Sequence, residues 1–331
     1  MAATKQRIIM NKNSKIYIAG HRGLVGNAIL RLLNESGYTN LLIRTHAELD
    51  LLDQESVNNF FAREKPEYVF LAAAKVGGIW ANSTYPADFI YINTLIGFNM
   101  IHAAFKNGVK KLINLGSSCI YPKLAPQPIK EEYLLSDLLE PSNEAYAIAK
   151  ISVIKLCTFF NKQYGTNFIS VMPTNLYGPG DNYDPLGSHV LPALIRKFHE
   201  AKISGYDIVS LWGNGSPRRE FLYSVDLALA LMMLMQNINA KDISTTAGDF
   251  INIGCGNDLT IKELAEKIRD VVYKGIPNRT CRIEWDISKP NGTPQKLLDI
   301  SRITAMGFSP KTSLTEGIKL AYEDFINNYK K

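Results

Sequence analysis

Residues 15–26 read KIYIAGHRGLVG, and this stretch decides the fold. A short β-rich run leads directly into three glycines, at positions 20, 23 and 26. From Leu24 to Ser36 the apolar residues recur at helical spacing, with Leu24, Ala28 and Leu32 on one face. The order predicts a strand, a glycine turn and a helix over 27–36.

The glycine turn suits an anion. Glycines after a first strand let the backbone approach a pyrophosphate at a helix N-terminus, where free N–H groups and the helix dipole favour negative charge. The spacing here is G-x-x-G-x-x-G, whereas the common dinucleotide fingerprint is G-x-G-x-x-G. Three glycines could also serve only tight packing of the helix on the strand. Their position favours a dinucleotide site made by Gly20, Arg22, Gly23, Leu24, Val25 and Gly26.

Strand and helix patterns alternate as far as residue 172. This rhythm indicates a parallel sheet covered by helices on both faces, with right-handed crossovers. We therefore expect an α/β, doubly wound, Rossmann-type domain followed by a smaller C-terminal substrate lobe. The predicted strands are 41–43, 68–74, 111–115 and 167–172, and the predicted helices are 53–64, 86–107 and 142–164.

Beyond Pro179 the alternation of strand and helix patterns becomes less regular. Two capping boxes, at Thr260–Glu263 and Ser313–Glu316, predict the starts of later helices. We expect a flexible leader, a cofactor domain with returning segments, and a lobe that mainly binds substrate. The expected boundaries are 1–14 for the leader, 15–178 with about 220–256 for the cofactor domain, and 179–331 for the substrate lobe.

Composition narrows the class of protein. The 331 residues are 46% hydrophobic and 21% charged, which is ordinary for a globular protein and excludes disordered or collagen-like chains. The sequence contains no run of 18 apolar residues, so it predicts no membrane span. The net charge of +6 is dispersed, which favours small polyanionic molecules over nucleic acid. Four widely spaced cysteines and no signal-peptide pattern predict a cytoplasmic protein without a metal site or disulfides.

Arg44 favours NADP(H) as the cofactor. An acid at the end of the second strand would bind the ribose 2′-hydroxyl of NAD, whereas an arginine there accommodates the 2′-phosphate of NADP. The strand ends at Ile43, and no acid follows until Glu48. Arg22 could assist. Arg44 could also be a solvated residue at a strand end.

Tyr146 and Lys150 lie four residues apart in a predicted helix, so both side chains share one face. A phenol has an ordinary pKa of about 10, and a nearby ammonium lowers that pKa by stabilising the phenolate. Such a phenol can exchange a proton with a carbonyl or alcohol oxygen. The same pair also arises by chance on many helices.

Ser117 follows the strand predicted at 111–115, at the sheet edge where α/β proteins bind ligands. A serine there can bond the same substrate oxygen as Tyr146. The glycine turn, Ser117, Tyr146 and Lys150, in this order, resemble the extended short-chain dehydrogenase/reductase superfamily. The resemblance implies that they bind a nicotinamide cofactor and act on a sugar ketone or carbinol, with Lys150 also holding the nicotinamide ribose.

Five longer segments extend the match: GHRG (20–23), SSCIYP (117–122), NEAYAIAK (143–150), MPTNLYGP (172–179) and SHV (188–190). Together they resemble the GDP-L-fucose synthase family, and the resemblance runs from about Lys15 to the C-terminus. It implies NADPH-dependent 3,5-epimerisation and 4-reduction of GDP-4-keto-6-deoxy-D-mannose to GDP-L-fucose by a homodimer. Another GDP-4-keto-6-deoxy sugar, such as a heptose, is the alternative substrate.

Cys119 and His189 match the family's acid/base pair, with Cys119 as the base and His189 as the acid. A C4 ketone acidifies the protons on C3 and C5, so inversion needs one group to remove a proton and another to return one. A thiol of pKa about 8.5 and an imidazole of pKa about 6.5 can both be tuned to this task. The resemblance also places His189 at the cofactor. From the residues alone, Cys119 could be a buried filler and His189 a residue bound by backbone at a helix start.

The resemblance assigns the nucleotide half of the substrate to the second lobe. Arg219 and Lys289 suit a diphosphate, while Trp212 could pack on the ligand or belong to the core. Lys197 stands where the family typically has arginine, and a lysine cannot reproduce bidentate geometry. The expected substrate residues are Asn175, Lys197, Trp212, Arg219 and Lys289.

Two points remain open at this stage. The apolar residues Ile151, Val153 and Ile154 of the helix that carries Tyr146 could line a four-helix dimer interface or face the sheet. A non-catalytic NADP-sensing protein on the same fold is the rival from another functional class. The intact pair of Tyr146 and Lys150 argues against that rival.

Overall fold

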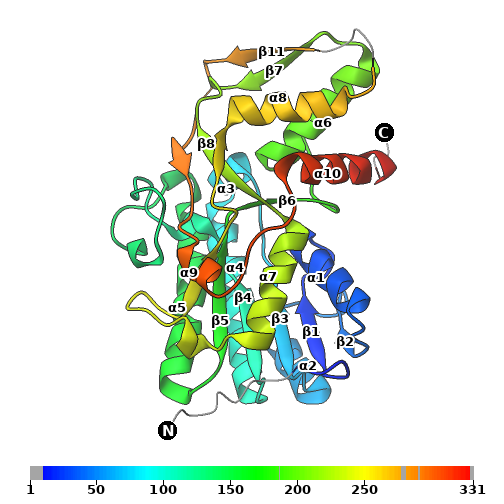
Figure 1. Cartoon of the computed structure of the whole chain (residues 1–331). Coiled ribbons are helices and arrows are strands. Elements are labelled where there is room, and N and C mark those ends of the chain that lie inside the picture. Colours follow the sequence, from blue (N-terminus) through cyan, green and yellow to red (C-terminus); the bar gives the residue numbers. More distant parts are fainter. Residues whose placement is uncertain (1–9, 186, 277–280, 290, 329–331) are drawn as a thin grey trace.

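The computed structural model describes residues 10–185, 187–276, 281–289 and 291–328. Figure 1 shows a lower lobe built on a large sheet and an upper lobe of helices and short strands, with the C-terminus in the upper lobe. The chain passes between the lobes more than once, so the segments that follow β5 in sequence contribute to both.

Six parallel strands form the large sheet, in the order β2-β1-β3-β4-β5-β9. Every residue of β1, β3, β4, β5 and β9 is buried, as a sheet covered on both faces requires. The strand order reverses between β1 and β3, and ligands bind at this point in open α/β sheets. The strands are β1 (Ile16–Ala19), β2 (Leu41–Leu42), β3 (Tyr68–Leu71), β4 (Lys111–Leu115), β5 (Phe168–Pro173) and β9 (Phe250–Ile253).

Helices cover both faces of this sheet, so the doubly wound α/β fold is confirmed. One face carries α1 (Leu24–Glu35) and α7 (Ser224–Asn237), which pack against each other. The other face carries α2 (Gln54–Glu64), α4 (Pro86–Lys106) and α5 (Glu144–Tyr164). The short α3 (Ile79–Thr84) precedes α4.

The upper lobe has its own apolar core between α6, α8, α10 and the short strands. The predicted box at Thr260–Glu263 is present at the start of α8 with both reciprocal bonds, and Ser313 Oγ accepts from the Glu316 N–H at 3.3 Å. The helices are α6 (Val190–Ser204), α8 (Ile261–Val272) and α10 (Leu314–Asn328), and the strands are β6 (Asn175–Tyr177), β7 (Ile208–Trp212), β8 (Arg218–Tyr223), β10 (Asp258–Thr260), β11 (Arg282–Asp286) and β12 (Gln295–Lys296).

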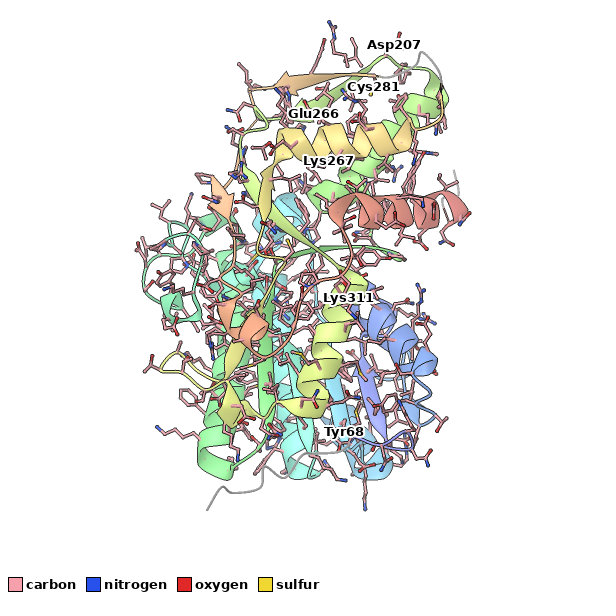
Figure 2. All side chains as sticks on the ribbon, in the orientation of Figure 1. Tyr68, Asp207, Glu266, Lys267, Cys281 and Lys311 are labelled. Carbon is pink, nitrogen blue, oxygen red and sulfur yellow. The ribbon has the colours of Figure 1, made fainter. Side chains whose placement is uncertain are left out.

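The last crossing between the lobes is fixed by Asp226, in the first turn of α7. Its carboxylate accepts the backbone N–H groups of Lys311 (3.2 Å) and Thr312 (3.0 Å), between α9 (Ser301–Ala305) and α10. Figure 2 shows Lys311 beside α7, where the chain turns toward the upper lobe. A buried carboxylate that binds two N–H groups satisfies backbone that the crossing would otherwise leave unpaired.

Several predicted boundaries were wrong. The first helix begins at Leu24 rather than 27, because Gly23 itself is the N-cap. The third strand ends at Leu71 rather than 74, and a 3₁₀ turn over Pro141–Asn143 precedes the helix predicted from 142.

The flexible leader predicted over 1–14 was also wrong for residues 10–14. Residues 1–9 lie outside the described part of the chain. Met10 is buried against the core of the large sheet, Ser14 is buried, and the Tyr38 hydroxyl donates to the Met10 carbonyl at 3.4 Å. Residues 10–14 are therefore part of the folded domain.

All four cysteines are free thiols. In the described part of the chain, no helix combines the length and apolar character needed to span a membrane.

Gly97 lets α4 approach α5, the helix that carries Tyr146. A Cβ at Gly97 would lie 2.2 Å from Cγ2 of Val153, inside any real contact distance. Val153 is itself buried, and its branched side chain has little rotamer freedom in a helix. The fit between Gly97 and Val153 therefore sets the spacing of the two longest helices.

The variant Gly97→Ala should lower the free energy of unfolding by about 1–3 kcal/mol, because overpacking a rigid contact costs that much. Val153→Ala opens space at the same point. The double variant should therefore lose less than the sum of the two single losses, measured by urea denaturation. Strict additivity within about 0.5 kcal/mol would show that the two positions do not limit the helix spacing.

Candidate functional site

The glycine turn brings β1, α1 and β3 into very close contact. Gly20 has φ +85°, and a Cβ there would lie 2.7 Å from the backbone nitrogen of Ala73, just beyond β3. A Cβ at Gly26 would lie 2.1 Å from the carbonyl oxygen of Gly20. Both glycines are thus required by packing alone, as the alternative interpretation of the turn proposed.

Gly23 has a different environment. It is exposed, it is the N-cap of α1, and no side chain caps the helix there. The first N–H groups of a helix lack partners within the helix, so this end can receive an anion. A Cβ on Gly23 would meet only the Gly20 carbonyl, at 3.5 Å. The turn lies at the switch point of the sheet, and Arg22 is exposed beside it. The residues fit a dinucleotide pyrophosphate.

Arg44 lies just after β2, partly buried. Its guanidinium bonds Glu64 Oε1 at 3.1 Å and the Ile43 carbonyl at 2.7 Å, and it lies over the Phe60 ring with its Cζ 5.3 Å from the centroid. These contacts hold the guanidinium at the edge of the sheet beside β1. They leave the prediction that Arg44 binds a 2′-phosphate untested.

Ser117, Cys119 and Tyr146 come together at the end of β4. The Ser117 hydroxyl accepts from the Cys119 N–H at 3.2 Å and is hydrogen-bonded to the side chain of Tyr146. Phe89 of α4 packs edge-on against the Tyr146 ring, with centroids 6.1 Å apart. A phenol, a hydroxyl and a thiol therefore lie around one point at the carboxyl edge of the sheet.

The predicted effect of Lys150 on Tyr146 was wrong for this structure. The pKa of Tyr146 is raised, mainly by burial and further by Cys119, while the bond from Ser117 lowers it. Lys150 donates to the Leu115 carbonyl at 2.8 Å, and its Nζ is 5.7 Å from the centroid of the Tyr146 ring. Burial lowers the pKa of Lys150 to about 8. The Lys150 ammonium, which the sequence analysis predicted to stabilise the Tyr146 phenolate, is instead bound by the main-chain carbonyl of Leu115.

His189 is the N-cap of α6, and its side chain makes no capping bond. The loop before it is tied to α3 by a bond from the Gly78 N–H to the Gly187 carbonyl, at 3.4 Å. Although His189 is exposed, the surrounding protein atoms desolvate the ring and lower its pKa. A lowered pKa favours the neutral imidazole near pH 7.

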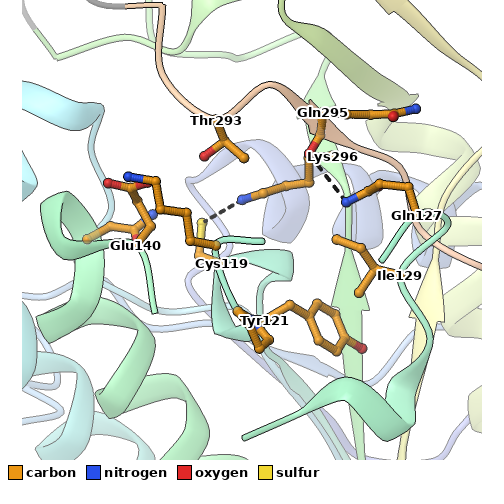
Figure 3. A pocket seen from close by; sticks show the side chains of 11 residues that line it. Cys119, Tyr121, Gln127, Ile129, Glu140, Thr293, Gln295 and Lys296 are labelled. Carbon is orange, nitrogen blue, oxygen red and sulfur yellow. Dashed lines mark hydrogen bonds and ion pairs between the residues drawn. The ribbon is translucent and has the colours of Figure 1, made fainter. Parts of the chain in front are cut away.

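A small pocket opens beside Cys119, and Figure 3 shows its side chains. Lys296 of β12 points at the sulfur from across the pocket, with Nζ 3.8 Å from Sγ. Asn143 also lines it, and the Asn143 Oδ1 is buried with no partner in the described structure. Lys296 was not predicted from the sequence, because a single lysine in the run TPQK (293–296) belongs to no chemical motif and reaches Cys119 only through the fold.

Three predicted substrate residues lie around β7 of the upper lobe. Trp212 is 65% exposed, so it is not a core aromatic, and Lys289 Nζ lies 5.8 Å from its ring centroid. Lys197 is exposed and donates to the Ser210 carbonyl at 3.1 Å. Lys289 therefore lies beside an open aromatic face, and Lys197 bonds the same strand at Ser210, so β7 offers positive charge and a ring that can receive a phosphate and a base.

The other two predicted substrate residues lie on β6 and β8, and Arg219 of β8 is near Cys119. Asn175 donates its amide to the Glu220 carbonyl at 2.8 Å, which holds β6 on β8. Arg219 of β8 is partly buried, and desolvation lowers its pKa while the nearby Cys119 opposes that effect. The site thus runs from the glycine turn, past Ser117 and Cys119, to the upper lobe.

Comparison with known proteins agrees with this arrangement. Residues 16–254 match the model of the NAD dependent epimerase/dehydratase family. GDP-L-fucose synthase 1 of Arabidopsis thaliana is 54% identical over 96% of this chain and 95% of its own length. GDP-L-fucose synthase of Escherichia coli is 52% identical over 95% of this chain and 97% of its own length.

A solved structure is similar over nearly the whole chain as well. It is a GDP-mannoheptose C4 reductase from Campylobacter jejuni with NADP bound, with a TM-score of 0.87, 42% identity, and coverage of 96% of this chain and 99% of that one. Family model, relatives and fold agree with each other. The chain therefore belongs to the NAD dependent epimerase/dehydratase family and, within it, to the GDP-L-fucose synthases.

Proposed function

We propose that this protein converts GDP-4-keto-6-deoxy-D-mannose to GDP-L-fucose by 3,5-epimerisation followed by 4-reduction, with NADPH as the reductant. The observation that carries the proposal is the meeting of Ser117, Cys119 and Tyr146 at the carboxyl edge of β4. A plain reductase needs the hydroxyl and the phenol but has no use for the thiol. Relatives above 50% identity bear the name of this activity.

The cofactor would lie across the switch point of the sheet. The α1 N-terminus at Gly23, with Arg22, would receive the pyrophosphate, and Arg44 the 2′-phosphate. Lys150 and His189 would hold the nicotinamide end. The NADP-bound relative at 42% identity supports NADP(H) as the cofactor.

Cys119 and His189 perform the epimerisation. The Cys119 thiolate removes the proton from C3 or C5, the electron pair of the broken C–H bond moves into the C4 carbonyl, and a thiol forms. His189, whose lowered pKa leaves it neutral near pH 7, takes up a proton and delivers it to the opposite face of the same carbon. Before the second carbon is inverted, the new thiol releases its proton to solvent and His189 takes up another. Ser117 donates to the C4 oxygen throughout, which stabilises the enolate charge.

Tyr146 completes the reduction. When bound, NADPH supplies the hydride that C4 accepts. Tyr146 delivers a proton to the C4 oxygen at the same time, and Ser117 keeps that oxygen in place. Because its pKa is raised, the Tyr146 phenol is protonated near pH 7 and carries the proton that the C4 oxygen receives.

The GDP half would lie on the upper lobe. Trp212 offers an open ring to the base, while Lys197, Arg219 and Lys289 offer positive charge to the diphosphate. Asn175 would contact the sugar near β6. We accordingly propose that residues 15–178, with segments returning from 220–256, bind cofactor and that residues 179–331 mainly bind substrate.

A heptose is the second candidate substrate, since a structurally similar relative is a GDP-mannoheptose C4 reductase. One extra carbon in a shaped pocket typically changes kcat/KM by about 10- to 200-fold. Measured on both GDP-4-keto-6-deoxy sugars, the ratio should favour the hexose by at least about tenfold. A preference for the heptose would reassign the substrate while leaving the chemistry in place.

We also propose a cytoplasmic homodimer. Free thiols are the state that a reducing compartment maintains. Ile151, Val153 and Ile154 are buried inside the chain, so they cannot form the dimer interface. Helices α4 and α5 instead expose large apolar side chains at helical spacing. These are Tyr91 and Phe98 on α4, and Ile148 and Phe159 on α5.

Replacing Tyr146 by phenylalanine removes the proton donor for reduction but not the epimerase pair. We expect kcat for GDP-L-fucose formation, followed as NADPH oxidation, to fall by about 10²- to 10⁴-fold. Deuterium should still enter C3 and C5 in deuterated water without NADPH. Loss of deuterium entry in this variant would place Tyr146 in the epimerisation as well.

Replacing Cys119 by serine should impair epimerisation while leaving the proton donor for reduction, Tyr146, in place. A serine hydroxyl is a far weaker base, so deuterium entry at C3 and C5 should slow by about 10²- to 10⁴-fold. NADPH affinity, measured by fluorescence titration, should change little. Equal losses of deuterium entry and NADPH binding would contradict the assigned role.

The dimer can be tested with Phe98→Asp, which puts a charge on the exposed face of α4. The wild type should sediment at twice the 37.0 kDa of one chain, and Phe98→Asp should shift it toward the mass of a single chain. Lys319→Asp, on α10 of the upper lobe, is the matched control and should leave the mass unchanged. A wild type that sediments as one chain would exclude the dimer.

A further inference from the structure

Lys296 is directed at the sulfur of Cys119 by the architecture of the site. Its Nζ lies 3.8 Å from Sγ, and Figure 3 shows the extended side chain crossing the pocket to reach it. Lys296 belongs to β12, which runs parallel to β8 with Lys296 opposite Arg219. Lys296 and Cys119 are 177 positions apart, so only the tertiary fold joins them.

The backbone on the C-terminal side of Lys296 is held firmly. The Leu297 N–H donates to Gln127 Oε1 at 2.8 Å, and the Leu298 N–H donates to the buried carboxylate of Glu220 at 3.1 Å. Gln127 also donates back to the Gln295 carbonyl, at 3.4 Å. A lysine side chain on an edge strand is usually mobile in solvent. Here the backbone of both neighbours of Lys296, Gln295 and Leu297, is hydrogen-bonded to the Gln127 side chain.

The charges that face Cys119 are mostly positive. Lys296 comes from β12, Arg219 from β8, and the neutral phenol of Tyr146 from α5. At the pocket rim, Glu140 is paired with Lys123 at 3.1 Å, so its charge is compensated. Within the described ranges, no carboxylate forms an ion pair with Lys296, which leaves its charge available to the sulfur.

We propose that Lys296 is a positioning residue for the epimerase step, and that its ammonium holds Cys119 as the thiolate that acts as base. This inference rests on the proposed function of Cys119. An opposite charge within 4–6 Å favours the ionised form of a titrating group. Lys296 itself releases no proton: the carbon-bound proton goes to sulfur, and the ammonium stays charged beside the resulting thiol.

The alternative is that Lys296 only binds the anionic half of the substrate. In that case, replacing Lys296 would raise KM but would leave the thiol of the free enzyme unchanged. The two roles therefore separate in a measurement on the enzyme without substrate.

The test is the pH dependence of alkylation of Cys119 by iodoacetamide, a neutral reagent whose approach is insensitive to charge. Peptide mass spectrometry would follow Cys119 from about pH 6 to about pH 10, across the ordinary thiol range. Lys296→Met should move the half-maximal rate upward by about 1 to 3 pH units. Lys296→Arg, which keeps the charge, should restore most of the wild-type position.

The matched control is Lys106→Met, which removes an exposed lysine from the end of α4 at the opposite edge of the sheet. It should leave the Cys119 profile unchanged. Alkylation of Cys255 in the same samples reports any general loosening of the fold, because this thiol is also accessible only in part. A shift confined to Cys119 and to Lys296→Met supports the proposal.

The proposal is overturned if wild type and Lys296→Met share one profile, or if Lys296→Arg fails to restore it while Cys255 is unaffected. Deuterium entry at C3 and C5 separates this result from the fate of the proposed function. If the profile shifts but Cys119→Ser still exchanges deuterium, the ion pair stands and Cys119 is not the base.

Discussion

In a parallel sheet all strands end at the same edge, and the active region of this protein depends on that constraint. Burial on both faces forces each connection through a helix, so β1, β3, β4 and β5 deliver their following loops to one line. At that edge the glycine turn after β1 lies against residues 72–73 after β3, and the run 117–121 follows β4, the next strand of the sheet. Gly20 and Gly26 permit the close approach of β1, α1 and the segment after β3, because these backbone segments lie closer than any side chain would allow.

The chemistry of the site follows from burial at that edge. Away from water the Tyr146 phenol keeps its proton more firmly, and the Lys150 ammonium becomes easier to discharge. Ser117 links the phenol to the backbone of Cys119, so a proton donor and a thiol share one small space. Positive charge enters from the opposite side, on Arg219 and Lys296 of two paired strands.

The presence of a second lobe explains how one chain can offer separate surfaces to a cofactor and to a substrate. The large sheet offers a cofactor turn and a reductase pair, whereas the second lobe carries Trp212 with Lys289 and brings Lys296 of the β8–β12 ladder to Cys119. The buried carboxylate of Glu220 ties the two together, because it accepts the N–H groups of Cys255, Gly256 and Leu298. A ligand between the lobes therefore meets residues from both at once.

The sequence by itself determined the sheet class, the family and the residues around β4, because local periodicity and short motifs record neighbours along the chain. It placed the helix start too late and the leader boundary too far along, since Gly23 as an N-cap and Met10 in the core are recognised only in three dimensions. Only the tertiary structure decided the partner of Lys150, the exposure of Trp212 and the approach of Lys296 to Cys119. Each of these is a contact between segments remote in sequence, and no local pattern of residue types encodes which distant atom a flexible cation will reach.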